Sequence, residues 1–591
     1  MEKALKQDIL KLIKENYSIE LYDINLTIPP KKEMGDFAFN CGILSRELKK
    51  NPNLIASEIL PLLKTISEIT DVSSEGAFVN IKVSKDIFTK KFFELYNLDF
   101  SSQFSYIGNG KKIIVDYIGA NVGKPLHIGH MCTPNIGQAM INIYKKFGYD
   151  VISDSHIGDW GIIFGKLITA YKLWGDENKL KENAVDYLLE LYVKITSEIE
   201  NDSDLEQKTR DEFKLLSEGN PESIELWSKF TKYSIEAMNK NLARLNVKPD
   251  YNIGESFYEG LGLPKMEDFP DLVFDMHSIV VELISKGIAT QNEDGSVGVI
   301  FENDKLPSCI LQKRDGTHGY LASDLACIKY RTSNWTPEKI VYFVDVRQQL
   351  HFKQAFEIAK NAGWLIPHSV SPKGREVATE LFHAFNGFIS GKEGAFSTRK
   401  GNIIKLGDLL DEAEIRAKKI ILEKRDDLDK KELNELSKII GIGAIKYGHL
   451  KKSRETDMIF DWDEFMTFEG NSGPYIQYAY VRALRIIENF GENFDMKVNS
   501  IFESLEEIEL VKQLGSYREV LVDTFNKNMP HILCKYAYDL TKTFNSFYNA
   551  VHILNEDDFE KKILRLKMVK LFTITLKDAF SILGIEMPNK M

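Results

Sequence analysis

The run IIVDYI at residues 113–118, followed by NVGKPLHIGH at residues 121–130, decides the fold class of this chain. The first run is rich in β-branched side chains and short enough to be a buried strand. A turn with Gly and Pro follows it, and then a helical stretch that ends near residue 147. A strand, a turn and a helix in this order open a parallel α/β domain. A second such unit begins with the strand pattern of residues 340–346 and continues as a helix to residue 363.

The stretch at residues 121–130 has the chemistry of an anion site, because unpaired backbone N–H groups and the positive end of a helix dipole meet at a strand-to-helix junction. His127 and His130 are three residues apart, so both imidazoles project from one side of the first turns. As donors they can stabilise charge that develops at phosphorus. Gly129 lets a flat base lie against the helix backbone. An isolated histidine is more often satisfied by nearby backbone, but this string in this context predicts a nucleotide site.

The length of 591 residues predicts three to four domains. Residues 1–105 combine helical segments with one strand-like piece at residues 77–83, and the polar stretch 101–112 is expected to be a linker. An α/β domain is expected over residues 106–405, and from residue 406 to 591 nearly every segment has a helical pattern.

A helical insertion is expected within the α/β domain at about residues 175–300. Apolar side chains recur there at helical spacing, which predicts core packing. These are Leu188, Leu191, Tyr192, Ile195 and Ile199.

The composition excludes several classes of protein. Acidic residues outnumber basic ones, 87 to 76, so a chain that is basic throughout, such as a histone-like nucleic-acid coat, is excluded, although a local basic groove is not. The five cysteines are scattered and form no C-x-x-C pair, which argues against a disulfide framework or a cysteine-rich zinc site. The first residues are charged and contain no apolar run. We therefore expect a cytoplasmic protein without a membrane partner and without a structural metal.

The string HIGH is the first signature of class I aminoacyl-tRNA synthetases, and the chain resembles the arginyl-tRNA synthetases among them. The matching segments are residues 121–126, HIGDWG at 156–161, DGT at 315–317, YLASDLA at 320–326, RQQLH at 347–351, FSTRKG at 396–401, GNSGPYIQYAY at 470–480 and the terminal Met591. The resemblance implies a Rossmann-like parallel-sheet catalytic domain with a helical insertion, an α+β N-terminal domain that contacts tRNA, and an all-α anticodon-binding domain. It also implies ATP with Mg²⁺, L-arginine and tRNA(Arg) as substrates, and a monomer.

The resemblance assigns the arginine site residue by residue. Asn121 and Gln348 hold the α-amino and carboxylate end, whereas Tyr320 and Asp324, with Glu255, face the guanidinium. A guanidinium is a planar fork of five donors that requires carboxylate acceptors. The spacing of i and i+4 puts the Tyr320 and Asp324 side chains on one helix face.

The second class I signature, Lys-Met-Ser-Lys-Ser in the family, departs in this chain because Thr398 stands in place of its second lysine. The resemblance implies that Lys124, three residues before His127, supplies the cation beside the leaving pyrophosphate. Besides Gly129, the residues that the resemblance places at ATP are Thr398, Arg399 and Lys400.

Aromatic and basic side chains suggest RNA contacts. Tyr475, Tyr478 and Arg482 share one face of a predicted helix, where rings and a guanidinium suit splayed bases, although aromatics at helical spacing are more often core. The resemblance puts them in the anticodon-binding domain with Met591 close by, and puts Phe37 and Asn40 at the elbow of tRNA.

Two other functions stay open from the sequence alone. One is another adenylate-forming ligase of the nucleotidyltransferase superfamily that acts without tRNA. The other is an RNA-binding paralogue without catalytic activity.

Overall fold

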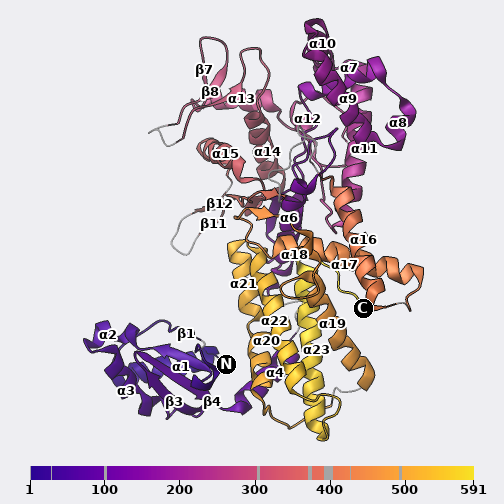
Figure 1. Ribbon diagram of the computed structural model, residues 1–591. Coiled ribbons are helices and arrows are strands. Elements are labelled where there is room, and N and C mark those ends of the chain that lie inside the picture. The colour runs from indigo at the N-terminus through magenta and orange to yellow at the C-terminus, as the bar shows by residue number, and fades with distance from the viewer. Residues whose placement is uncertain are drawn as a thin grey trace. The chain divides into compact units, whose positions relative to one another are not determined.

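The computed structural model describes residues 2–27, 29–98, 103–265, 267–301, 306–365, 367–370, 376–391, 404–425, 427–491 and 496–591 (Figure 1). The chain divides into two compact units, each described here by itself. One contains Met1–Asp99, Arg482–Arg518 and Asp539–Thr575, and the other contains Phe100–Val481, Glu519–Tyr538 and Leu576–Met591.

The N-terminal part of the first unit is an α+β fold. Its four strands form an antiparallel sheet in the order β1-β2-β4-β3. The strands are β1 (Leu26–Thr27), β2 (Phe37–Asn40), β3 (Ile69–Glu75) and β4 (Phe78–Val83), and the helices are α1 (Glu2–Tyr17), α2 (Gly42–Leu48), α3 (Pro52–Leu63) and α4 (Lys85–Tyr96). The predicted strand is β4, in which Val79, Asn80 and Ile81 are all buried and burial alternates only from Ile81 to Val83. The other three strands extend the predicted piece into a sheet.

A parallel sheet with the strand order β13-β10-β5-β6 forms the core of the second unit. Its strands are β5 (Lys112–Asp116), β6 (Asp150–Asp154), β10 (Lys339–Tyr342) and β13 (Glu380–His383). Helix α6 (Cys132–Lys146) comes after β5, α14 (Tyr320–Trp335) precedes β10, and α15 (Gln349–Asn361) comes after β10. Both predicted strand–turn–helix units are confirmed. The centre of β5 is buried, as in a parallel sheet covered on both faces.

The predicted linker at residues 101–112 is wrong in its central part. Phe104 is buried and its ring stacks on Phe147 with centroids 4.6 Å apart, and α5 (Ser105–Gly108) follows it. Gly148 has a φ of +81°, and a Cβ there would lie 2.1 Å from the carbonyl oxygen of Ser105. A hydrophobic anchor within a polar stretch therefore fastens this segment to the end of α6.

The insertion is helical up to residue 285 and then becomes a small antiparallel sheet, β7-β8-β9. Its elements are α7 (Ile162–Trp174), α8 (Glu177–Glu182), α9 (Ala184–Ile199), α10 (Ser203–Ser217), α11 (Pro221–Arg244), α12 (Glu255–Tyr258), α13 (Met276–Ser285), β7 (Thr290–Gln291), β8 (Val297–Val299) and β9 (Cys309–Gln312). Figure 1 shows α7 to α11 gathered into one bundle. Leu188, Leu191 and Ile195 of α9 are buried, as their spacing predicts.

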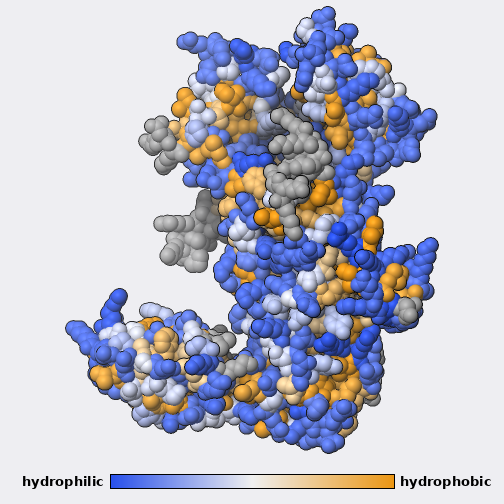
Figure 2. Space-filling view, in the orientation of Figure 1, coloured by the Kyte–Doolittle hydropathy of each residue, from blue (hydrophilic) through white to orange (hydrophobic). Residues whose placement is uncertain are grey.

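The C-terminal part is helical, as expected. Its helices are α16 (Leu406–Lys424), α17 (Lys430–Leu450), α18 (Trp462–Met466), α19 (Gly473–Phe490), α20 (Leu505–Gly515), α21 (Tyr517–Lys527), α22 (Pro530–Ala550) and α23 (Phe559–Ile582), and one short strand pair joins β14 (Ile389–Ser390) to β15 (Met458–Ile459). Among the described residues no helix is both long and apolar enough to span a membrane. On the face shown in Figure 2 hydrophilic side chains prevail, with hydrophobic ones in scattered groups between them.

Candidate active site

The first signature begins at the short 3₁₀ helix η2 (Ile128–Met131), for which His127 is the N-cap residue. Nδ1 of His127 accepts a hydrogen bond of 3.1 Å from the N–H of Gly129, and Nδ1 of His130 accepts one of 3.2 Å from the N–H of His127. A backbone N–H can only donate, so Nδ1 carries no proton in either ring. The proton of each neutral imidazole is therefore on Nε2. The two ring centroids are 3.9 Å apart, so the two donors lie side by side.

Both histidines are neutral at physiological pH. Burial lowers the pKa of His127, and burial together with His127 and Lys124 lowers the pKa of His130 to about 3. The pair can therefore donate hydrogen bonds to phosphate without adding a fixed charge. We call the site of these two histidines the His127–His130 corner. Its positive charge comes from Lys124, whose field acts on His130.

The chain that follows the second signature runs beside the first. The N–H of Ile128 donates to the carbonyl of Ile404 at 2.9 Å, and the N–H of Leu406 donates to the carbonyl of Leu126 at 2.8 Å. Lys405 is thus paired with His127 as in an antiparallel bridge. The predicted ATP ligands of the second signature, Thr398, Arg399 and Lys400, lie outside the described residues.

A second group of polar side chains lies at the carboxyl ends of the parallel strands. Asp324 of α14 accepts a hydrogen bond of 2.6 Å from Nε2 of His351, at the start of α15. His156, just after β6, lies 3.9 Å from the other oxygen of Asp324 and 3.2 Å from Oγ of Ser323. Although burial favours the protonated acid, the hydrogen bond from His351 and the fields of both histidines lower the pKa of Asp324. Asp324 is therefore an ionised carboxylate.

Several carboxylates surround Glu255. Burial, with the fields of Asp159, Asp324 and Glu259, raises the pKa of Glu255 to about 7, against the opposing field of His156. Burial also raises the pKa of Asp159 to about 6, although its carboxylate accepts 2.8 and 2.7 Å hydrogen bonds from the N–H and Oγ of Ser256. This excess of acid over base fits a cationic ligand.

His156 is the second histidine beside Asp324, farther from it than His351. Burial alone would lower the pKa of His156, but Cys327, Asp324 and Glu255 raise it well above its usual range. Its Nδ1 lies 3.3 Å from the carbonyl oxygen of Ile253 and therefore carries a proton.

The remaining predicted arginine ligands lie at the rim. The ring of Tyr320 is 76% exposed at the first position of α14, and the field of Glu255 acts on its hydroxyl. Asn121 is exposed and pairs with Gly158, where a Cβ would lie 2.3 Å from Oδ1 of Asn121. Gln348 is exposed where η4 (Val346–Gln348) passes into α15. The structure thus groups Asp324 with Glu255, and leaves Asn121, Tyr320 and Gln348 accessible.

The floor of this cluster is a buried ion network. Arg331 of α14 is fully buried and binds Asp116 at the end of β5 and Asp154 at the end of β6, each at 2.7 Å. Asp154 also accepts a hydrogen bond of 3.2 Å from the N–H of Ile253, the residue whose carbonyl faces His156. One arginine therefore ties two strand ends to the loop that orients His156.

The helical insertion reaches both polar groups. The indole Nε1 of Trp227 in α11 donates to the carbonyl of Asp159 at 2.8 Å, and Oγ of Ser234 in the same helix accepts from the N–H of Gly123 at 3.2 Å. Asp186 of α9 binds Lys405 at 2.8 Å. The insertion therefore holds three separate loops of the site.

The predicted RNA-binding residues have varied surroundings. Tyr475 is half-buried with its ring centroid 6.1 Å from that of Tyr538, and Tyr478 is 42% exposed, both on α19. Within the first unit, Arg482 lies over the ring of Tyr548 at 5.2 Å. Met591 packs against the core between α16, α17 and α18.

The two N-terminal candidates differ in exposure. The ring of Phe37 is buried in the sheet, whereas Asn40 is exposed and its Oδ1 accepts from the N–H of Gly42 at 2.8 Å.

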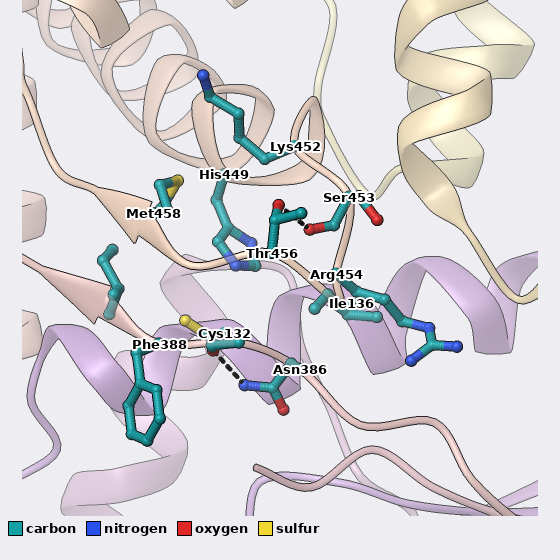
Figure 3. A pocket seen from close by; sticks show the side chains of 12 residues that line it. Cys132, Ile136, Asn386, Phe388, His449, Lys452, Ser453, Arg454, Thr456 and Met458 are labelled. Atoms are coloured by element: carbon teal, nitrogen blue, oxygen red, sulfur yellow. Dashed lines mark hydrogen bonds between the residues drawn. The ribbon is translucent and has the colours of Figure 1, made fainter. Parts of the chain in front are cut away.

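A small pocket lies between α6 and the turn after α17 (Figure 3). Its volume is about 20 Å³, which is room for no more than a water molecule. Cys132, Asn386 and His449 line it, so it is separate from both polar groups. Among the described residues, moreover, no group of three or more His, Cys, Asp or Glu side chains could hold a metal ion.

Neither His156 nor His351 was predicted to be a site residue, although both lie in segments that match the family. The position of His156 directly after a parallel strand is the signal that could have placed it at the site, because the carboxyl ends of such strands converge. His351 has no such signal, since its contact with Asp324 joins two different helices.

Family profiles match three consecutive parts of the chain. The profile described as tRNA synthetases class I (R), catalytic domain, matches residues 98–462, which is more than half of the chain. The arginyl tRNA synthetase N terminal domain matches residues 1–83, and the DALR anticodon binding domain matches residues 476–591.

Curated relatives are similar over the full length. The arginine–tRNA ligase of Clostridium acetobutylicum is 36% identical over 595 residues and covers 100% of both chains. That of Clostridium beijerinckii is 36% identical over 589 residues, covering 99% of this chain and 100% of its own. In fold, the chain is similar to the arginyl-tRNA synthetase of Thermus thermophilus, with a TM-score of 0.77, 21% identity and 100% of both chains covered.

Proposed function

The chain belongs to the arginyl-tRNA synthetase family, and we propose that it activates L-arginine between the His127–His130 corner and the acidic cluster around Asp324. The overall reaction is the ATP-dependent attachment of arginine to tRNA. The observation that supports the location is the pairing of neutral Nε2–H donors at one end of the site with an ionised, histidine-bound carboxylate at the other.

The guanidinium of arginine binds to Asp324 and Glu255. The hydrogen bond from His351 occupies Oδ2 of Asp324, which leaves Oδ1 for the ligand. A bound cation favours the ionised form of Glu255, so this group accepts hydrogen bonds once arginine is present. Tyr320 closes the pocket from the rim, and Asn121 with Gln348 holds the α-amino and carboxylate groups.

The first step is in-line attack by an arginine carboxylate oxygen on the α-phosphorus of ATP. A bond between the carboxylate oxygen and phosphorus forms, and the bond to the pyrophosphate oxygen breaks with its electron pair leaving on pyrophosphate. His127 and His130 donate from Nε2 to the oxygens on which charge develops, and Lys124 neutralises the leaving group. Gly129 accommodates the adenine, Thr398, Arg399 and Lys400 approach ATP from the second signature, and Mg²⁺ enters bound to the nucleotide.

In the second step a ribose hydroxyl of the terminal adenosine of tRNA(Arg), the 2′-OH, attacks the activated carbonyl carbon. The ester bond to tRNA forms, the mixed anhydride breaks, and AMP leaves with the electron pair. The hydroxyl proton is released as AMP departs.

We assign residues 1–105 to tRNA contact, 106–405 to catalysis with the insertion at about 175–300, and 406–591 to anticodon binding. Tyr475, Tyr478, Arg482 and Met591 contact tRNA in the anticodon-binding part. In the N-terminal part Asn40 contacts tRNA, and the buried ring of Phe37 supports β2, the strand that carries Asn40. The exposed ring of Tyr478 supports base stacking. We propose a cytoplasmic monomer.

ATP–pyrophosphate exchange with each standard amino acid, with and without total tRNA, tests this proposal. We expect exchange with arginine alone, dependent on tRNA. Exchange with a different substrate or without any tRNA effect indicates a small-molecule ligase, and no exchange in any mixture indicates an RNA-binding paralogue. Lys124→Ala is expected to lower the exchange rate with little change in arginine affinity, and unchanged exchange in that variant refutes the role of Lys124.

A further inference from the structure

Two lysine amines share one aromatic ring next to the first signature. Nζ of Lys124 lies 5.1 Å from the centroid of Tyr192, and Nζ of Lys166 lies 5.8 Å from the same centroid. Both distances are within the range of a cation–π contact. The three residues come from the loop after β5, from α7 and from α9 of the insertion.

The place of these amines is fixed by packing around the loop. Leu167, next to Lys166, packs on the turn at Gly123, where a Cβ would lie 2.9 Å from Cδ1 of Leu167. The field of Lys124 in turn reaches His130. Tyr192 therefore holds Lys166 at the same ring as Lys124, the lysine whose field reaches His130.

Neither amine has a neutralising partner among the described side chains. Both lysines are only half-buried, and no carboxylate of the described residues forms an ion pair with either. The positive fields of the two ammonium groups add at the ring that they share, and this favours an anion that binds both. The ring holds the amines from its π face and competes for no hydrogen bond, so all their donors remain for the ligand.

We propose that Lys166 and Lys124, gathered over the ring of Tyr192, form a two-lysine site for the pyrophosphate end of ATP. Lys166 is a binding residue for the leaving group, and Tyr192 is a positioning residue that acts through both lysines. The proposal rests on the proposed function, because it takes the role of Lys124 as given. It also supplies a second cation in a chain whose second signature has Thr398 in place of a lysine.

The helix that carries Tyr192 strengthens this assignment. Asp186, on the same helix α9, binds Lys405, which is paired with His127. One helix therefore contacts both Lys124, just before the first signature, and Lys405, in the segment paired with that signature, so the insertion takes part in the geometry of ATP binding.

The test measures KM for pyrophosphate and for arginine in ATP–pyrophosphate exchange with saturating tRNA. Lys166→Ala and Tyr192→Leu are each expected to raise the KM for pyrophosphate about tenfold and to leave the KM for arginine unchanged. Tyr192→Phe, which keeps the ring, should behave as the unchanged protein. In a Lys124→Ala/Lys166→Ala background Tyr192→Leu should have no further effect.

Lys194→Ala is the matched control, because this lysine of α9 lies 4.0 Å over the ring of Trp174 and is expected to leave both KM values unchanged. An unchanged KM for pyrophosphate in Lys166→Ala, together with a loss in Lys124→Ala, overturns the two-lysine site and leaves the proposed function intact. An equal loss in the Tyr192→Leu and Tyr192→Phe variants, or a further loss from Tyr192→Leu in the double-lysine variant, overturns the role of the ring. If neither lysine variant changes the KM for pyrophosphate, both the two-lysine site and the proposed role of Lys124 are refuted, whereas arginine-dependent exchange by these variants leaves the overall reaction standing.

Discussion

His351 and Asp324 form a hydrogen bond of 2.6 Å between two helices of the catalytic domain, from Nε2 to Oδ2. The bond fixes the carboxylate plane and, despite burial, keeps Asp324 ionised. An ionised carboxylate with one oxygen occupied presents the other in a defined direction.

Replacing His351 with Ala is expected to raise the KM for arginine about 10- to 100-fold, since a hydrogen bond to a charged group contributes about 1.5–3 kcal/mol. Arginine-dependent pyrophosphate exchange measures the change. His351→Gln, which keeps an N–H donor, should lose less. Equal losses in both variants would contradict an effect through the hydrogen bond.

Arginine affinity should depend on pH through Glu255. With a pKa of about 7 in the ligand-free site, this group is mostly protonated at pH 6 and mostly ionised at pH 8. The guanidinium binds the ionised form, so the KM for arginine should fall as pH rises from 6 to 8, and binding near pH 7 should release about half a proton per site. Calorimetry of arginine binding in buffers of different ionisation enthalpy measures this proton. Glu255→Gln should remove the release, although overall affinity drops.

The same group lowers the stability of the ligand-free protein. Its pKa rises from 4.5 to about 7 on folding, so the folded state binds more protons than the unfolded state between these values. Stability is therefore lost as pH rises through this window, by roughly 3 kcal/mol at most. Glu255→Gln should raise the thermal midpoint at pH 8 and have little effect at pH 4.5. The reverse order of these two effects would show that Glu255 does not carry a raised pKa.

Gly158→Ala should weaken arginine binding through Asn121. The new Cβ would lie 2.3 Å from Oδ1 of Asn121, and this movable side-chain end can swing away more easily than the paired backbone can shift. We expect a roughly tenfold rise in the KM for arginine with a thermal midpoint close to that of the unchanged protein, comparable to the loss of one bond to a charged ligand group. The Gly158→Ala/Asn121→Ala double variant should have the same KM for arginine as Asn121→Ala alone. A further rise in KM in the double variant would show that Gly158→Ala does not act through Asn121.

Arg331→Met should lower stability by about 3–5 kcal/mol, because it leaves Asp116 and Asp154 without their buried partner. Thermal unfolding followed by circular dichroism measures the loss. Arg210→Met is the matched control, since that arginine is 59% exposed and its i,i+4 pair with Glu206 is worth about 0.3–0.5 kcal/mol. Similar losses of stability in the two variants would mean that the buried ion network contributes no more to stability than an exposed ion pair.

Local pattern predicted a large part of this molecule. The β-branched run before residue 118 and the histidines three residues apart are neighbours in sequence, so their geometry follows from one strand and one turn. Tyr320 and Asp324 likewise need only a single helix. In the N-terminal part, β1 has only two residues and the exposed positions of β3 give no alternating pattern, so these strands could not be recognised alone.

Contacts between residues far apart in the sequence could not be predicted from local sequence patterns. Arg331 in a helix is typical of a solvated face, yet it is fully buried because two strand ends present carboxylates to it. Tyr192 fits an apolar stripe, and core packing is right for its neighbours Leu188 and Ile195. Tyr192 itself is half-buried beneath two lysines.

The helical insertion is not an interchangeable module. A chain shortened by excision of residues 177–244 would lose the acceptor for Gly123, the donor to Asp159 and the carboxylate that anchors Lys405. A graft from another protein would have to reproduce all three at once, on two helices with a fixed mutual register. A shortened version of this enzyme should therefore keep α9 and α11 together, and residues should be deleted from other parts of the chain.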